Sequence, residues 1–240
     1  MSNSKLVNYT KLSPNHSGKR THSIDRITPH CVVGQCSVET LGNIFMNTAC
    51  EASCNYGIGY DGRVLLCVDE SNRSWCSSSN ANDQRAVTIE CASDTVAPYT
   101  MNSKVYNKLI ALCVDICKRN GKTKLLWFGN EDKTLNYSPK SGEMVLTVHR
   151  WFANKSCPGD WLYNRLGNLA DEVTAQLGGK TSNKANEEMI KYGAHNTATL
   201  AFKKQLITLY NMRIIKTKVD NSNGFGDGTL KAVKEAQRAG

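Results

Sequence analysis

Three side chains that can bind a metal ion or stabilise negative charge lie close together in the segment 148–160, which reads VHRWFANKSCPGD. They are His149, Lys155 and Cys157. An imidazole and a thiolate are both good zinc ligands. A lysine two residues before the thiolate could place a cation beside a metal-bound oxygen. Because two ligands do not complete a zinc site, a third must come from elsewhere in the chain.

The sequence offers His30 as the third ligand. It lies in the segment 27–33 (ITPHCVV), whose β-branched residues predict a strand with Pro29 near its start. A single histidine among apolar neighbours is more often structural than a ligand, so both interpretations stand at this stage. If His30 joins His149 and Cys157, the fourth position of a tetrahedral zinc stays open, as in catalytic sites. Zinc lowers the pKa of water held there towards 7.

The segments around these residues predict a mixed α/β domain, with a central mixed β-sheet of about five strands flanked by helices. Apolar alternation and turn signals predict strands at 27–33, within 53–68, and at 86–91, 125–128 and 144–148. Helical spacing predicts helices at 37–47, 105–120 and 161–177. The pair Gly178-Gly179 ends the last helix, so we expect the domain to close there.

The chain therefore divides into three parts. Residues 1–179 form the catalytic domain, beginning with a polar, extended N-terminal arm that ends near Arg26. Residues 180–195 read as a linker by composition. Residues 196–240 form a small helical module, close to the lower size limit for an independent core.

Charge is unevenly spread along the chain, whose formal net charge is +9. From Lys180 onward, 11 lysines and arginines stand against 5 aspartates and glutamates. Such a basic part favours an anionic partner, whether nucleic acid, a membrane surface or an anionic cell-wall polymer. A merely solvated surface explains it equally well. No finger-like cysteine pair or aromatic-studded strand supports nucleic-acid binding.

Composition also sets expectations about compartment. No apolar run approaches the roughly 20 residues that a membrane helix needs. Residues 1–15 are polar and lack the apolar stretch of a signal peptide, so we expect a cytoplasmic protein. Most of the ten cysteines lie in or beside apolar segments, so we expect reduced, structural thiols rather than a disulfide framework.

Five segments, in this order, carry a resemblance to a known family. They read TPH at 28–30, SCNYGIGYDGRV at 53–64, DESNRSW at 69–75, NDQRAVTIE at 82–90 and HRWFANKSCPG at 149–159. The chain resembles the zinc-dependent N-acetylmuramoyl-L-alanine amidases of the type-2 amidase and peptidoglycan-recognition-protein superfamily. It is most similar to endolysins of clostridial phages and prophages.

The resemblance implies a role for each matching residue. His30, His149 and Cys157 match the family's zinc ligands, Glu90 matches the general base or water-orienting carboxylate, and Lys155 matches the lysine that stabilises the oxyanion. In another branch of the family a tyrosine acts as acid and base. Cys54 occupies that position here, so we assign the base role to Glu90.

Weaker candidates for substrate contact are Trp75 and Asn82. Trp75 matches the tryptophan of a WHAG-like motif, whereas Cys76 stands where the family usually has histidine. The residues 202–206, 220–233 and 234–237 resemble a peptidoglycan-binding helical module that we expect to be truncated.

The resemblance implies hydrolysis of the amide bond between N-acetylmuramic acid and L-alanine in bacterial peptidoglycan. Such a phage-type lysin would remain in the cytoplasm until a membrane hole forms. The alternative is a muropeptide-binding protein of the same fold that does not cut its ligand. In such proteins the thiolate ligand is typically replaced, so Cys157 favours the enzyme.

Overall fold

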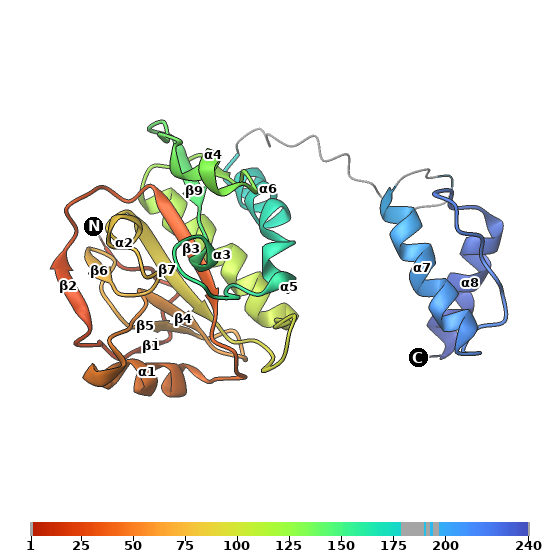
Figure 1. The fold of residues 1–240 in the computed structure, drawn as a ribbon, viewed down its shortest axis with the longest axis horizontal. Coiled ribbons are helices and arrows are strands. Elements are labelled where there is room, and N and C mark those ends of the chain that lie inside the picture. The colour runs from red at the N-terminus through yellow and green to blue at the C-terminus, as the bar shows by residue number, and fades with distance from the viewer. Residues whose placement is uncertain (1, 179–189, 191–192, 194–196, 240) are drawn as a thin grey trace. The chain divides into compact units, whose positions relative to one another are not determined.

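The computed structural model describes residues 2–178, 190, 193 and 197–239, and divides into two compact units, Met1–Ser182 and Asn183–Gly240 (Figure 1). The linker predicted at 180–195 lies almost wholly outside the described residues. None of the described helices is both long and apolar enough to cross a lipid bilayer.

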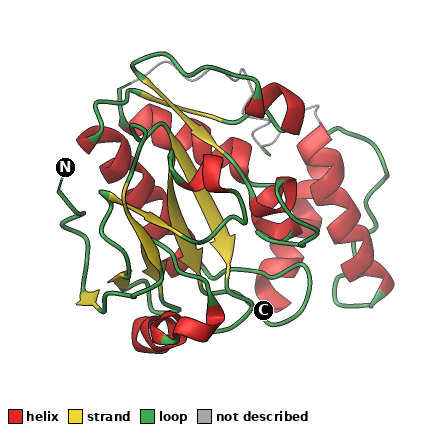
Figure 2. Cartoon of the chain, turned by 60° about the vertical axis from the view of Figure 1, so that its left-hand side comes forward, coloured by secondary structure: helices red, strands yellow, loops and turns green. Residues whose placement is uncertain are grey.

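A seven-stranded mixed sheet forms the centre of the first unit (Figure 2). Its order is β1 (Tyr9–Thr10), β5 (Val64–Leu66), β4 (Tyr56–Ile58), β7 (Ala86–Cys91), β3 (Arg26–Cys31), β9 (Glu143–Leu146) and β8 (Lys124–Leu126). All neighbours are parallel except β4 and β5. The predicted sheet flanked by helices is confirmed, although it has more strands than the five or so that we expected.

Helices cover both faces of this sheet because successive side chains of a strand point to opposite faces, and the apolar ones on both faces are buried. On β5, Leu65 packs on one face, while Val64 and Leu66 belong to the core on the other. The face with Leu65 receives α1 (Val38–Met46), which begins at Ser37, whose side chain accepts a hydrogen bond from the Thr40 amide.

The other face carries the larger core, built from α3 (Ser103–Arg119) and α6 (Leu166–Gln176). Asn102 caps α3 by accepting from the Val105 amide. The buried stripe of α3 includes Leu109, Leu112 and Ile116, all fully buried. The helix predicted at 105–120 is therefore present as α3, within two residues of its predicted ends.

The helix predicted at 161–177 is interrupted. It forms α5 (Asp160–Tyr163) and then α6, because the Arg165 amide bonds to the Leu162 carbonyl three residues back, at 2.8 Å. The Trp161 carbonyl is instead satisfied by the Arg165 guanidinium at 2.9 Å, and this cation also lies 4.2 Å from the Trp161 ring centroid.

The N-terminal arm is more ordered than its composition suggests. Besides β1, it contributes β2 (His16–Lys19), which pairs antiparallel with β6 (Asn72–Ser74) in a two-stranded sheet. Short helical segments complete the unit: η1 (Thr48–Cys50), α2 (Asn80–Asp83), α4 (Glu131–Leu135) and η2 (His149–Trp151). The ten cysteines, all in described residues, are free thiols.

The second unit contains α7 (Thr197–Asn211) and α8 (Asp227–Ala239), joined through a small core of Leu206, Ile215, Val219 and Ala232. Lys203 of α7 is fully buried there. Its ammonium donates to Asp220 Oδ1 at 2.7 Å, Ser222 Oγ at 3.1 Å and the Gly224 carbonyl at 2.9 Å. These bonds satisfy all three donors of the buried cation, which anchors the loop before α8.

Candidate active site

Two parallel neighbouring strands bring His30 and Glu90 together. His30 on β3 is directly paired with Glu90 on β7, so both side chains point to the same face of the sheet. Both residues lie near the carboxyl ends of their strands, where open α/β sheets place their sites. His30 Nδ1 lies 3.9 Å from Glu90 Oε1, and the His30 side chain is fully buried.

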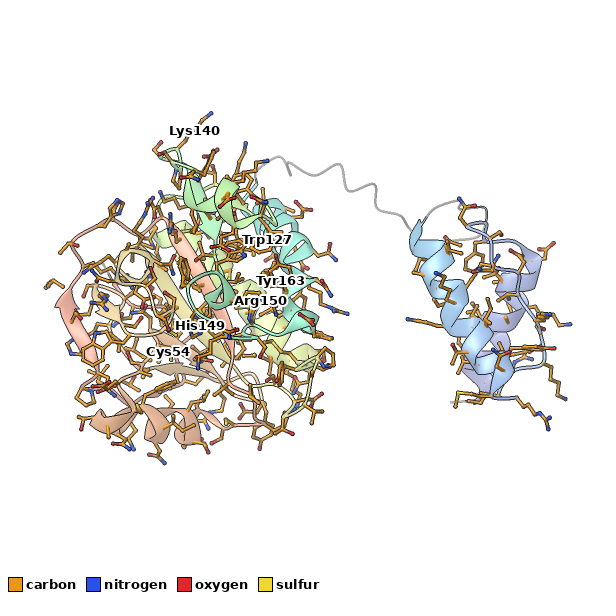
Figure 3. The ribbon with its side chains drawn as sticks, in the orientation of Figure 1. Cys54, Trp127, Lys140, His149, Arg150 and Tyr163 are labelled. Atoms are coloured by element: carbon orange, nitrogen blue, oxygen red, sulfur yellow. The ribbon has the colours of Figure 1, made fainter. Side chains whose placement is uncertain are left out.

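His149 arrives from β9, the other neighbour of β3. Directly after β9, the Thr147 amide donates to the Ile27 carbonyl at 3.0 Å, and His149 is the first residue of η2. The rings of His30 and His149 meet edge to face, with centroids 5.1 Å apart. The adjacent Arg150 guanidinium lies 4.6 Å from the Tyr163 ring centroid, which fixes η2 against α5 (Figure 3).

Cys157 is held in place by the turn that follows it. Gly159 has φ +80°, and a Cβ at this position would lie 2.9 Å from the Pro98 carbonyl oxygen. Only glycine allows this close approach. The Arg150 amide donates to the Cys157 carbonyl at 3.1 Å, closing the loop from η2. Cys157 Sγ consequently lies 3.2 Å from His30 Nδ1.

The three predicted ligands fit a zinc ion by their donor chemistry and spacing. One ligand atom from each of His30, His149 and Cys157 lies within 4.8 Å of the other two. Imidazole and thiolate are both zinc ligands, and three protein ligands leave the fourth position of a tetrahedral zinc open, as in catalytic sites. The buried Nε2 of His30 has no hydrogen-bond partner among the described residues, as expected where a ligand completes the site.

Ser78 supports this cluster, and sequence reasoning missed it. Its Oγ lies 2.9 Å from His149 Nε2, which leaves Nδ1 of that ring for a metal. Ser78 adopts a left-handed backbone conformation with φ 62°. It stands between Ser77, which donates to Asp83, and Ser79, which caps α2, so the run of serines carries no signal that distinguishes it.

Burial keeps both imidazoles neutral, as metal ligands must be. It lowers the pKa of His30 to about 3, with a further contribution from His149. Burial and then Lys155 lower the pKa of His149. The pKa of Cys157 is raised well above its usual value by a hydrogen bond with Cys31 and by burial. Metal binding would therefore release a proton from this thiol.

Glu90 is the carboxyl group of the site. Burial raises its pKa to about 7, opposed in part by a hydrogen bond from Cys76. Its side chain is 14% exposed, so it retains access to the cleft. A carboxyl group with such a pKa can accept and return a proton near neutral pH.

Two adjoining hollows lead to the cluster. The larger, about 680 Å³, is lined by Trp75, Cys76, His149 and Lys155, among others. The smaller, about 390 Å³, is lined by Glu90, His149, Lys155 and Cys157, among others. The exposed Lys155 belongs to both walls, so the structure brings it to the opening of the cluster.

The two candidates for substrate contact differ in placement. Trp75 lines the larger hollow, and its indole donates to Ser17 Oγ at 2.7 Å. Asn82 is fully buried and lines neither hollow. Its amide donates to Thr28 at 3.0 Å and accepts from Thr147 at 3.0 Å, so it ties β3 to the segment after β9. The structure does not bring Asn82 to the cleft.

Comparison with known proteins adds independent findings. The profile of a family described as N-acetylmuramoyl-L-alanine amidase matches residues 19–160, more than half of the chain. No curated protein matches the chain.

Several solved structures are similar. That of PlyL shares 14% identity, with 69% of this chain and 95% of that chain covered and a TM-score of 0.49. The endolysin and N-acetylmuramoyl-L-alanine amidase LysCS of Clostridium intestinale shares 15% identity, with 72% and 98% covered and a TM-score of 0.45. The Drosophila peptidoglycan recognition protein SA shares 15% identity, with 65% and 89% covered and a TM-score of 0.47.

Proposed function

The chain belongs to the N-acetylmuramoyl-L-alanine amidase family, and from this premise we propose that it is a zinc-dependent hydrolase of bacterial peptidoglycan. The bond cut joins N-acetylmuramic acid to L-alanine. The observation that carries the proposal is the convergence of His30, His149 and Cys157, whose ligand atoms lie within 4.8 Å of one another beside Glu90.

In this proposal the two imidazoles and the thiolate would hold one zinc ion. Zinc bound there would supply a Lewis acid that polarises the amide carbonyl and acidifies water. Ser78 keeps the His149 ring in the orientation that serves the metal, through the 2.9 Å contact at Nε2.

Glu90 moves the proton. Its carboxylate, beside His30, takes a proton from the water that attacks the amide carbonyl. The same group then returns the proton to the departing amine of L-alanine. Its pKa of about 7 suits both transfers near neutral pH.

Lys155 stabilises the negative charge that develops on the former carbonyl oxygen. It is exposed and lines both hollows. A preorganised donor of this kind typically lowers the barrier by about 3 kcal/mol. Trp75 offers an aromatic wall to the substrate in the larger hollow.

We extend the proposal to the biological setting. The protein acts on the cell wall as a phage-type lysin, remaining in the cytoplasm until it is released. Its basic residues from Lys180 onward hold anionic wall polymers. Detection of the protein in the medium before lysis would contradict the first statement, and wall binding unaffected by salt would contradict the second.

The test of the activity uses the full-length protein loaded with zinc and purified cell walls of several types. We expect free L-alanine amino termini to appear without new reducing ends. Glu90→Gln should retain zinc and lose turnover by about 10²–10⁴-fold. Glu131→Gln, which changes an exposed carboxylate on α4, is the matched control and should keep full activity.

Three outcomes would oppose the proposal. The absence of new amino termini on every wall type would refute the hydrolase. Binding of muropeptides without cleavage would favour the recognition protein. A purified protein that takes up no zinc would refute the metal centre.

A further inference from the structure

The thiol of Cys76 is directed at the carboxylate proposed as the general base. Its Sγ lies 3.8 Å from Glu90 Oε1, a long hydrogen bond from a thiol, which is a weak donor. The other oxygen of this carboxylate, Oε2, is buried and has no hydrogen-bond partner among the described residues. The orientation of Glu90 therefore depends on the contact at Oε1.

Cys76 is itself rigidly held. Its amide donates to Asp83 Oδ2 at 3.1 Å, and the Ser77 hydroxyl donates to Asp83 Oδ1 at 2.6 Å. Asp83 is buried, with 1% of its surface exposed. The backbone of the loop between β6 and α2 is thus fixed to α2, which places the Cys76 side chain beside Glu90.

In this contact the thiol is the donor and the carboxylate oxygen is the acceptor. Burial, and next the charge of Glu90, raise the pKa of Cys76 well above its usual value. Cys76, His30 and Glu90 do form a second group of possible ligands within 4.8 Å. However, it shares His30 with the group proposed to bind zinc.

We propose that Cys76 is a positioning residue for amide hydrolysis, because its thiol holds Glu90 Oε1 beside Nδ1 of His30. The inference rests on the proposed function and adds to it a residue that differs from the histidine of the family motif. In this role the thiol acts through the orientation of the carboxylate.

Kinetics of variants test the role in turnover. Cys76→Ala should lower kcat by about 3- to 10-fold, the value of one hydrogen bond, with KM and zinc content unchanged. Cys76→Ser, which keeps a hydroxyl donor, should recover most of that loss. Cys36→Ala is the matched control: this half-buried thiol packs in the same cluster as Cys76 but lines neither hollow.

Infrared spectroscopy tests the contact without relying on activity. The difference between wild type and Cys76→Ser isolates the S–H stretching band of Cys76. We expect this band at lower frequency in the wild type than in Glu90→Ala, because donation to a carboxylate weakens the S–H bond. If the wild type cleaves no amide, the proposed function fails, while the infrared result still decides the contact.

Each opposite result would overturn the inference. An S–H band unmoved by Glu90→Ala would show that the hydrogen bond is absent. If Cys76→Ala kept the wild-type kcat, or if the kcat of Cys76→Ser were no higher than that of Cys76→Ala, the donor would have no catalytic value. A change confined to KM would assign Cys76 to substrate contact, and a loss of zinc would assign it to the metal.

Discussion

Replacing Ser78 with alanine should weaken zinc binding while leaving every ligand in place. The substitution removes the 2.9 Å hydrogen bond to His149 Nε2, so that ring can rotate away from the orientation that serves the metal. Loss of such an outer partner typically costs about 10- to 100-fold in metal affinity, or about 1.4–2.7 kcal/mol. Both serine and alanine carry a Cβ, so the strain at φ 62° is common to both proteins.

The assay is a competition titration of the full-length protein against a chromogenic zinc chelator. The matched control is Ser156→Ala. Ser156 precedes a proposed ligand and lines the smaller hollow, but its side chain makes no hydrogen bond to His30, His149 or Cys157 in the described structure. We expect the control to bind zinc within about twofold of the wild type.

Equal affinities for wild type and Ser78→Ala would refute this reasoning, since they would show that Ser78 does not orient a ligand. An equal loss in Ser78→Ala and Ser156→Ala would also refute it. That result would attribute the effect to general loosening of the loops rather than to the imidazole contact.

Other substitutions and conditions have equally defined outcomes. Lys155→Met should lower kcat by about 100-fold with little change in zinc content, measured by amide release. Gly159→Ala should lower the free energy of unfolding by about 2–4 kcal/mol in denaturant titration, because φ is +80° and the new Cβ meets the Pro98 carbonyl. Acidification should destabilise the second unit. The hydrogen bond from Lys203 lowers the pKa of Asp220, so the stabilisation from this pair is complete above the unfolded pKa of Asp220, about 4, and is lost as the pH falls below that value. Amide hydrogen exchange of α7 in the full-length protein measures this, and Asp220→Asn should reduce the pH dependence, leaving the part due to Glu235, whose pKa is also lowered by its hydrogen bonds with Thr217.

Much of the arrangement around His30 could be predicted from local pattern. The apolar, β-branched segments at 27–33 and 86–91 have few alternatives to buried strands, and they form β3 and β7. Their direct pairing brings His30 beside Glu90. The motif containing His149 and Cys157 follows another predicted strand, so its position at the same edge of the sheet could also be predicted from the sequence.

The parts that escaped prediction depend on tertiary contacts. The strands β1 and β2 are short and polar, and they exist because β5 and β6 offer free edges to them. The interruption before α6 depends on the Arg165 side chain, which donates a hydrogen bond to the Trp161 carbonyl in place of a backbone amide. Asn82 was a candidate for substrate contact, but it is buried, and its side chain is hydrogen-bonded to Thr28 and Thr147 within the fold.

Anomalous diffraction from crystals of the zinc-loaded protein, collected at the zinc absorption edge, tests the metal centre most directly. We expect one strong peak within bonding distance of His30, His149 and Cys157. A peak centred instead on Cys76 and Glu90, or no peak in a protein that still releases L-alanine amino termini, would contradict it.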